Sequence, residues 1–145
     1  MKLFNQYKLN VYDNFIDKFN LQTKASTLVW IKHVMLPHFK YEFDLYNKTA
    51  LSLIDESLLG IPNVTTARAY AFKLHELART LENDKQFYIR ALAHMVSTIH
   101  VKTHALKCCD YLIKMIQFQT KDADRVVSER LRQISLIDRQ QEDKV

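Results

Sequence analysis

The sequence predicts an all-α protein, a single-domain bundle of about six to seven helices. The chain of 145 residues contains one Gly and two Pro, which is few turn-forming residues for a β protein of this size. Long segments rich in Leu, Lys, Glu and Ala repeat their apolar residues at a period near 3.6. A hydrophobic content of 48% with 26% charged residues is typical of a globular protein. We therefore expect residues 1–145 to form one helical domain.

Two helices are predicted near the N-terminus. Residues 6–20 repeat aromatic and aliphatic side chains at four-residue steps, which indicates a short amphipathic helix. A strongly apolar second helix follows, with Ser26 or Thr27 as its cap. Pro37 removes a backbone donor and disfavours helical geometry in the residue before it, so this helix kinks or ends there. The residues expected in the core from this helix are Trp30, Val34 and Leu36.

Two further helices are predicted on either side of the single glycine. The third helix runs from about Asn47, as its cap, to Leu59. Gly60 follows at the position where a helix C-terminus favours left-handed backbone, and Pro62 prevents the helix from continuing. The fourth helix covers residues 65–81, with alanines on one face that permit close packing against a neighbouring helix.

Residues 87–116 contain an internal break. The apolar faces of residues 87–99 and 105–116 would lie about 120° apart in one straight helix. Either the helix is buried on most sides, or it turns near Val101–Thr103 with Thr103 capping the second half; we favour the turn. A final amphipathic helix is expected over residues 121–139.

The histidines are the first candidates for a functional site. His100 and His104 are four residues apart, a spacing at which two imidazoles on one helix can share a metal. Cys108 continues the row, but at 1.5 Å per residue it lies about 12 Å from His100, so the three cannot bind one ion. The Glu-x-x-His pairs of a di-iron bundle do not occur in the sequence. We expect His75, His94, His100 and His104 to be structural or interface residues.

Catalytic, cofactor-binding and metal-binding residues are therefore not expected, and neither is a cofactor. One alternative stays open, a small helical metalloprotein or hydrolase that uses a cluster of those four histidines. The adjacent Cys108 and Cys109 are expected to be reduced thiols that serve as small packing residues, since a bridge between neighbours would strain the geometry. Asp110 is expected to pair with Lys114 on a helix surface.

The net charge of +5 leaves the class of partner open. Residues 68–114 carry eight Lys or Arg against four acids, but bases and acids alternate, so nucleic-acid binding ranks lowest. No apolar run approaches the ~20 residues that span a bilayer, and the first residues lack the apolar core of a signal peptide. We expect a cytoplasmic protein without a membrane partner.

Three segments together resemble a known family. Residues 91–105, ALAHMVSTIHVKTHA, resemble the His-Ala-Val-Ala-Thr-x-His-Val-x-x-His-Ala signature of bacterial putative immunity proteins of the Imm-5-like type. Residues 30–39 are similar to the family's His-Val-Leu-Pro-x-Phe stretch, and residues 66–79 to its Ala-rich helix. The resemblance covers residues 28–116. It implies an all-α, non-enzymatic protein that binds and neutralises a cognate toxin of unidentified nature; a homodimer stays open.

Overall fold

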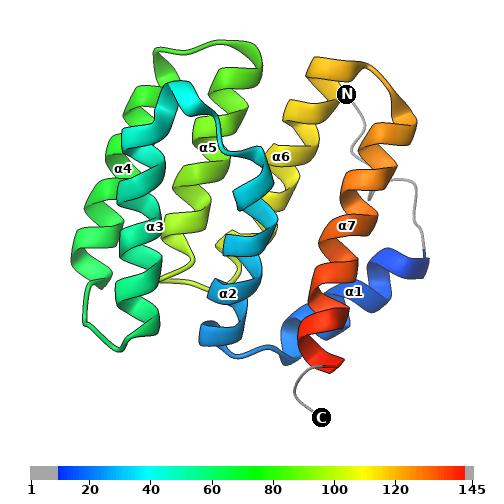
Figure 1. The fold of residues 1–145 in the computed structure, drawn as a ribbon, viewed down its shortest axis with the longest axis horizontal. Coiled ribbons are helices and arrows are strands. Elements are labelled where there is room, and N and C mark those ends of the chain that lie inside the picture. The colour runs from blue at the N-terminus through cyan, green and yellow to red at the C-terminus, as the bar shows by residue number, and fades with distance from the viewer. Residues whose placement is uncertain (1–9, 143–145) are drawn as a thin grey trace.

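The computed structural model describes residues 10–142, and within them it contains seven α-helices and no strand (Figure 1). The all-α class and the number of helices are therefore confirmed. The helices are α1 (Asn10–Leu21), α2 (Lys24–Met35), α3 (Asp44–Leu58), α4 (Val64–Arg79), α5 (Asn83–Ser97), α6 (His104–Thr120) and α7 (Ala123–Glu142). Two 3₁₀ turns, η2 (Leu36–His38) and η3 (Tyr41–Phe43), join α2 to α3. The predicted helix over residues 6–20 is observed from Asn10 onward, and its first part lies outside the described residues.

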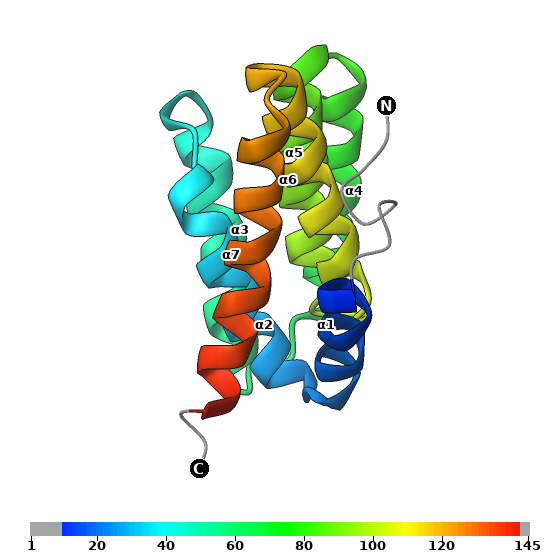
Figure 2. The same cartoon turned by 90° about the vertical axis from the view of Figure 1, so that its right-hand side faces the viewer.

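The helices form two layers. Helix α5 lies between α4 and α6 and packs most extensively on these two neighbours. Helix α2 packs against both α3 and α7, and these three cover one side of the α4–α5–α6 layer (Figure 2). Helix α1 packs on the lower part of α7 in Figure 1. The opposite side of the α4–α5–α6 layer is left without a covering helix from the described residues.

The core is continuous between the two layers, and Trp30 is its largest side chain. Its ring is fully buried and lies 5.8 Å and 5.9 Å, between ring centroids, from Phe15 and Phe19. Its indole Nε1 donates to the carbonyl of Gln133 in α7 at 3.0 Å. The expectation for Trp30 and Val34 is confirmed, whereas the expectation for Leu36 is wrong: that side chain is 39% exposed, because the η2 turn at Pro37 leads it out of the α2 register.

Several helix starts differ from the sequence predictions. Thr23, not Ser26 or Thr27, caps α2, and its Oγ1 accepts from the amide of Ser26 at 3.0 Å. Helix α3 begins at Asp44, so Asn47 lies inside the helix rather than capping it. The Asn47 side chain is used elsewhere: it donates to the carbonyl of Lys40 at 3.0 Å and accepts from the hydroxyl of Tyr88 at 2.5 Å. A tertiary hydrogen bond thus explains the residue better than a local cap.

The two predicted interruptions are confirmed. Gly60 follows α3 with a φ of +83°, the left-handed conformation expected there. Helix α5 ends at Ser97 and α6 begins at His104, so the stretch 87–116 is two helices joined by a turn. Thr103 occupies the N-cap position of α6, but its side chain forms no capping hydrogen bond. Among the helices of residues 10–142, none is both long enough and apolar enough to cross a lipid bilayer.

Candidate functional site

Three of the four candidate histidines form a row across the α4–α5–α6 layer. The rings of His75 in α4 and His94 in α5 meet edge to face with centroids 5.1 Å apart. His94 in turn stacks on His104 at the start of α6, again with centroids 5.1 Å apart. We call His75, His94 and His104 the histidine row. His100 stands outside it, exposed in the turn between α5 and α6.

The row lies on the uncovered side of the layer. At about 100° per residue, Arg90 and His94 point away from the side of α5 that carries Tyr88. The hydroxyl of Tyr88 bonds to Asn47 of α3, which fixes that side of α5 against the covering helices. His94 is nevertheless 9% exposed only, because α4 and α6 close over it from both flanks.

Hydrogen bonds define the protonation of the row. The Arg90 guanidinium donates from Nη1 to Nδ1 of His75 at 2.6 Å. Because a guanidinium only donates, this nitrogen of His75 is unprotonated, and the proton of the neutral ring is on Nε2. The Nδ1 atoms of His94 and His104 lie 2.9 Å apart, so one of these rings donates and the other accepts.

The electrostatics keep all three rings neutral at pH 7. Burial, with the charges of Arg90 and Arg79, lowers the pKa of His75 to about 4. Burial, with His75, His104 and Lys107 close by, lowers the pKa of His94 to about 3. Burial and Lys107 also lower the pKa of His104. An imidazole this acidic is a poor general base at neutral pH, so the row fits a structural or binding role better than proton transfer.

The described residues show no arrangement suited to a metal. Within residues 10–142, no three His, Cys, Asp or Glu side chains converge in a geometry that holds an ion. The partner that orients His75 is the cation of Arg90, whereas metal-binding imidazoles are oriented by carboxylates or carbonyls. The two thiols are also unsuited to chemistry: Cys108 and Cys109 are fully buried and free, and burial raises the pKa of each.

A second polar cluster, which sequence reasoning missed, ties α7 to the bundle. Glu129 is buried and accepts from His38 at 2.8 Å, from Arg132 at 2.9 and 3.0 Å, and from Gln133 at 3.0 Å. Burial would raise the pKa of Glu129, but the hydrogen bonds from His38 and Arg132 outweigh it and lower the pKa. Residues 128–133 are mostly polar, and such a segment normally predicts a solvent-exposed helix surface. The only sequence signal for a cluster was the three- and four-residue spacing of the polar side chains, which places them on one side of a helix.

Arg130 extends this cluster to α6. Its side chain is fully buried and donates to Asp110 at 2.6 Å and to Gln133 at 3.0 Å. The predicted pair between Asp110 and Lys114 is therefore wrong: Asp110 is turned toward α7, and the ammonium of Lys114 lies 4.8 Å from the ring centroid of Tyr111. A fully buried guanidinium without a carboxylate partner is strongly destabilising, and Lys114 is less buried than Arg130. Asp110 therefore pairs with Arg130 rather than with Lys114.

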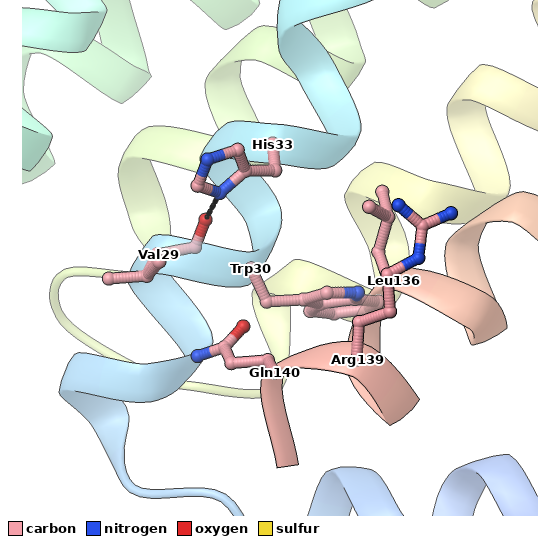
Figure 3. A pocket seen from close by; sticks show the side chains of 6 residues that line it. All are labelled: Val29, Trp30, His33, Leu136, Arg139 and Gln140. Carbon is pink, nitrogen blue, oxygen red and sulfur yellow. Dashed lines mark hydrogen bonds between the residues drawn. The ribbon is translucent and has the colours of Figure 1, made fainter. Parts of the chain in front are cut away.

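A pocket between α2 and α7 offers little chemistry. Its volume is about 210 Å³, and Figure 3 shows the six side chains that line it. The ring of His33 donates from Nδ1 to the carbonyl of Val29 in the preceding turn at 2.8 Å, and Gln140 donates to the carbonyl of Ser26 at 2.7 Å. These polar groups are engaged with backbone, and the pocket is smaller than the ~300–1,000 Å³ of typical ligand sites.

Comparison with known families identifies the chain. The model of the Imm-5 like putative immunity protein family matches residues 17–140. The chain belongs to this family. The match extends beyond the 28–116 segment that carried the resemblance, and it takes in the end of α1 and most of α7. No curated protein and no solved structure matches the chain. Membership in an immunity family is consistent with a non-enzymatic protein and implies a toxin as the partner.

Proposed function

We propose that the protein is a cytoplasmic, single-domain immunity protein that binds a cognate toxin and neutralises it by protein–protein contact, without catalysis. The observation that carries the proposal is the family match over residues 17–140. The site chemistry supports it, because the three rings of the histidine row are neutral at pH 7 and both thiols are buried. A metalloprotein or hydrolase function has no supporting observation among the described residues.

Co-expression tests the proposal. Genes that lie beside the gene of the present protein are expressed from an inducible promoter, with and without the present protein, and colony counts are compared for those that prove toxic. We expect growth to be restored, and the two purified proteins to form a complex of defined stoichiometry. Failure to restore growth, together with the lack of a complex, would refute the proposed function. Restored growth without a complex, accompanied by chemical modification of the toxin, would instead indicate an enzyme.

A further inference from the structure

We propose that the toxin docks on the uncovered side of the α4–α5–α6 layer, and that the surface it presents there is rich in carboxylates. The inference rests on the proposed function and specifies its contact surface. The surface consists of the histidine row with Phe72, Arg79, Arg90, Lys107 and Lys114 around it; we call these eight residues the basic face.

The helix register places these side chains together. On α4, Phe72, His75 and Arg79 are three and four residues apart and share one side of the helix. On α6, the corresponding positions are His104, Lys107, Tyr111 and Lys114, and on α5 they are Arg90 and His94. The contacts agree with the register. Arg79 and Arg90 both act on the charge state of His75, Lys107 acts on that of His94 and His104, and Lys114 lies over the Tyr111 ring that stacks on His94.

The cations of the basic face are unpaired. Within residues 10–142, none of Arg79, Arg90, Lys107 and Lys114 forms an ion pair. Other basic side chains of the described residues are matched with acids, and these pairs are Lys18–Asp138, Lys32–Asp55, Lys40–Asp84, Lys48–Asp44, Lys85–Glu42, Arg130–Asp110 and Arg132–Glu129. Unpaired cations such as Lys73 and Arg139 also occur away from the basic face, so it is the clustering of four unpaired cations that distinguishes this side. Glu76 borders this side, about 60° from Arg79 around α4, and offsets part of the charge. Four cations remain against this acid, so the side keeps a net positive charge that attracts a negatively charged surface.

Arg90 is oriented by a hydrogen bond to a neutral group, so no carboxylate neutralises its charge. Arg130, fully buried, is neutralised by Asp110, whereas Arg90 is half-buried and bonds to a neutral imidazole. The bond to His75 orients the guanidinium and leaves its remaining N–H groups for a partner. A planar guanidinium with several free donors is suited to two parallel hydrogen bonds with one carboxylate.

Phe72 supplies the apolar part of the surface. Its ring is 61% exposed on α4, one turn before His75. An aromatic side chain beside arginines is the composition that dominates binding energy in protein–protein interfaces, where charged groups at the rim contribute rate and specificity. An exposed phenylalanine within a field of cations thus indicates a protein partner with both apolar and acidic groups.

A second copy of the chain is disfavoured as the occupant. In a two-fold dimer the same patch meets itself, which would place the unpaired cations of one basic face against those of the other. Nucleic acid would satisfy the charge. Its bases stack on successive exposed aromatic rings, however, and the basic face offers Phe72 alone, because the neighbouring Tyr111 ring is already packed against His94 and Lys114. Nucleic acid is accordingly an outcome to be distinguished by experiment.

Two doubly substituted variants test the inference. Arg79→Glu/Lys107→Glu reverses two exposed cations of the basic face. Lys73→Glu/Arg139→Glu makes the same change in charge at two exposed positions away from it, on the other side of α4 and on α7. In the co-expression assay, we expect the first variant to lose protection and its affinity for the purified toxin to fall at least about tenfold per charge. The second variant should protect and bind within about twofold of the unmodified chain.

The outcomes separate the two proposals. If the unmodified chain and both variants protect equally, the docking surface is refuted and the proposed function stands. If the unmodified chain does not protect, the proposed function is refuted. A second measurement then tests the docking surface by itself. In that measurement, poly-L-aspartate is titrated into the protein at low ionic strength, and the side-chain NMR signals of Phe72, His75 and His104 are followed.

We expect these signals to move in the unmodified chain and in Lys73→Glu/Arg139→Glu, and to stay in place in Arg79→Glu/Lys107→Glu. The inference is overturned if the signals of other residues shift instead, or if the shifts are equal in both variants. A single-stranded oligonucleotide of the same total charge is titrated in parallel. Tighter binding of the oligonucleotide at the same residues overturns the protein partner in favour of nucleic acid.

Discussion

The Nδ1 atoms of His94 and His104 lie 2.9 Å apart across the α5–α6 interface, so two imidazoles from different helices share one hydrogen bond. The bond requires the accepting ring to be neutral with its proton on Nε2, and a neutral donor ring carries its proton on Nδ1. Burial of His94 supplies that condition, because it disfavours the charged ring. The neutral charge state of the row is therefore a consequence of packing, and it can be tested through stability.

Replacing His94 should destabilise the fold. His94→Ala removes a buried ring that contacts His75, His104 and Tyr111, and it leaves the hydrogen-bonding nitrogen of His104 without its partner. We expect the free energy of unfolding to fall by about 2–4 kcal/mol in urea denaturation. The matched control is His100→Ala, which changes an exposed histidine and should stay within about 0.5 kcal/mol. Equal effects of the two substitutions would contradict the packed row.

Acid should weaken the protein above the range in which carboxylates titrate. The pKa of His75 is about 4 and that of His94 about 3 in the folded state, both below the usual value of 6.5. The unfolded chain therefore binds more protons below pH 6.5, and the free energy of unfolding decreases as the pH falls from 6.5 toward 4. One buried histidine contributes at most about 1.4 kcal/mol per pH unit.

Urea unfolding at pH 7.5, 6.5, 5.5 and 4.8 measures this slope. Glu129 and Asp84 have pKa values lowered below those of ordinary carboxyls, so their loss of charge falls below this window. His94→Gln should show a shallower dependence than the unmodified chain, because one of the titrating rings is gone. A stability that stays constant or rises on acidification between pH 6.5 and 4.8 is incompatible with neutral buried imidazoles.

Glu129 should be required for the docking of α7. Glu129→Gln keeps the shape of the side chain but removes the charge that His38 and Arg132 bond to. We expect a loss of about 1–3 kcal/mol, since hydrogen bonds to a buried charged group are worth more than neutral ones. Glu76→Gln removes a charge from an exposed position and should leave the unfolding midpoint within error. An unchanged midpoint for Glu129→Gln would show that the cluster does not hold the helix.

Gly60→Ala tests the energetic cost of left-handed backbone at the α3–α4 turn. A Cβ added to Gly60 meets no atom within 4 Å, so sterics with other residues contribute nothing. The φ of +83° remains unfavourable for alanine, and we expect a loss of about 1–2 kcal/mol in thermal or urea unfolding. Ser52→Ala, on the exposed side of α3, serves as the control and should be neutral or slightly stabilising. A neutral Gly60→Ala would place the turn in a different conformation.

The thiols should react only through unfolding. Cys108 and Cys109 are both 0% exposed, and burial raises the pKa of each, so little thiolate is present at neutral pH. We expect the reaction with Ellman's reagent in buffer to be slower than in urea by about 10³-fold or more, following the fraction of unfolded chain. The reaction should release two equivalents only after denaturation. Rapid release of one equivalent from the folded protein would reveal an accessible cysteine.

The helices could be predicted from the sequence, and their starts could not. Apolar periodicity and the single Gly60 fixed the class, the number of helices and the turn after α5, because these features are local. Asn47 illustrates the failure. Asparagine favours caps, yet Asn47 lies within α3 and bonds to Tyr88, a residue far along the chain. The local preference of a residue for a helix cap is overridden when its side chain can form a tertiary hydrogen bond.

The candidate site could likewise be predicted only in part. All four histidines were predicted as structural or interface residues. The sequence cannot show that His75, His94 and His104 form a row while His100 is turned outward, since this depends on where α5 ends. The role of Arg90 as partner of His75 was missed, because the two residues lie on different helices. The buried cluster of Glu129 and Arg130 was missed for the opposite reason: charged residues at helical spacing normally lie on the surface, and only the packing of α7 on α2 and α6 buries them.

Trp30, the only tryptophan of the chain, sits where α1, α2 and α7 meet and bonds to the backbone of α7. Its fluorescence therefore reports on one half of the molecule alone. A red shift in emission without a change in far-UV circular dichroism would signal that α7 has detached while the helices persist. Stopped-flow mixing with a partner could then tell whether capture loosens the C-terminal helix or leaves it untouched.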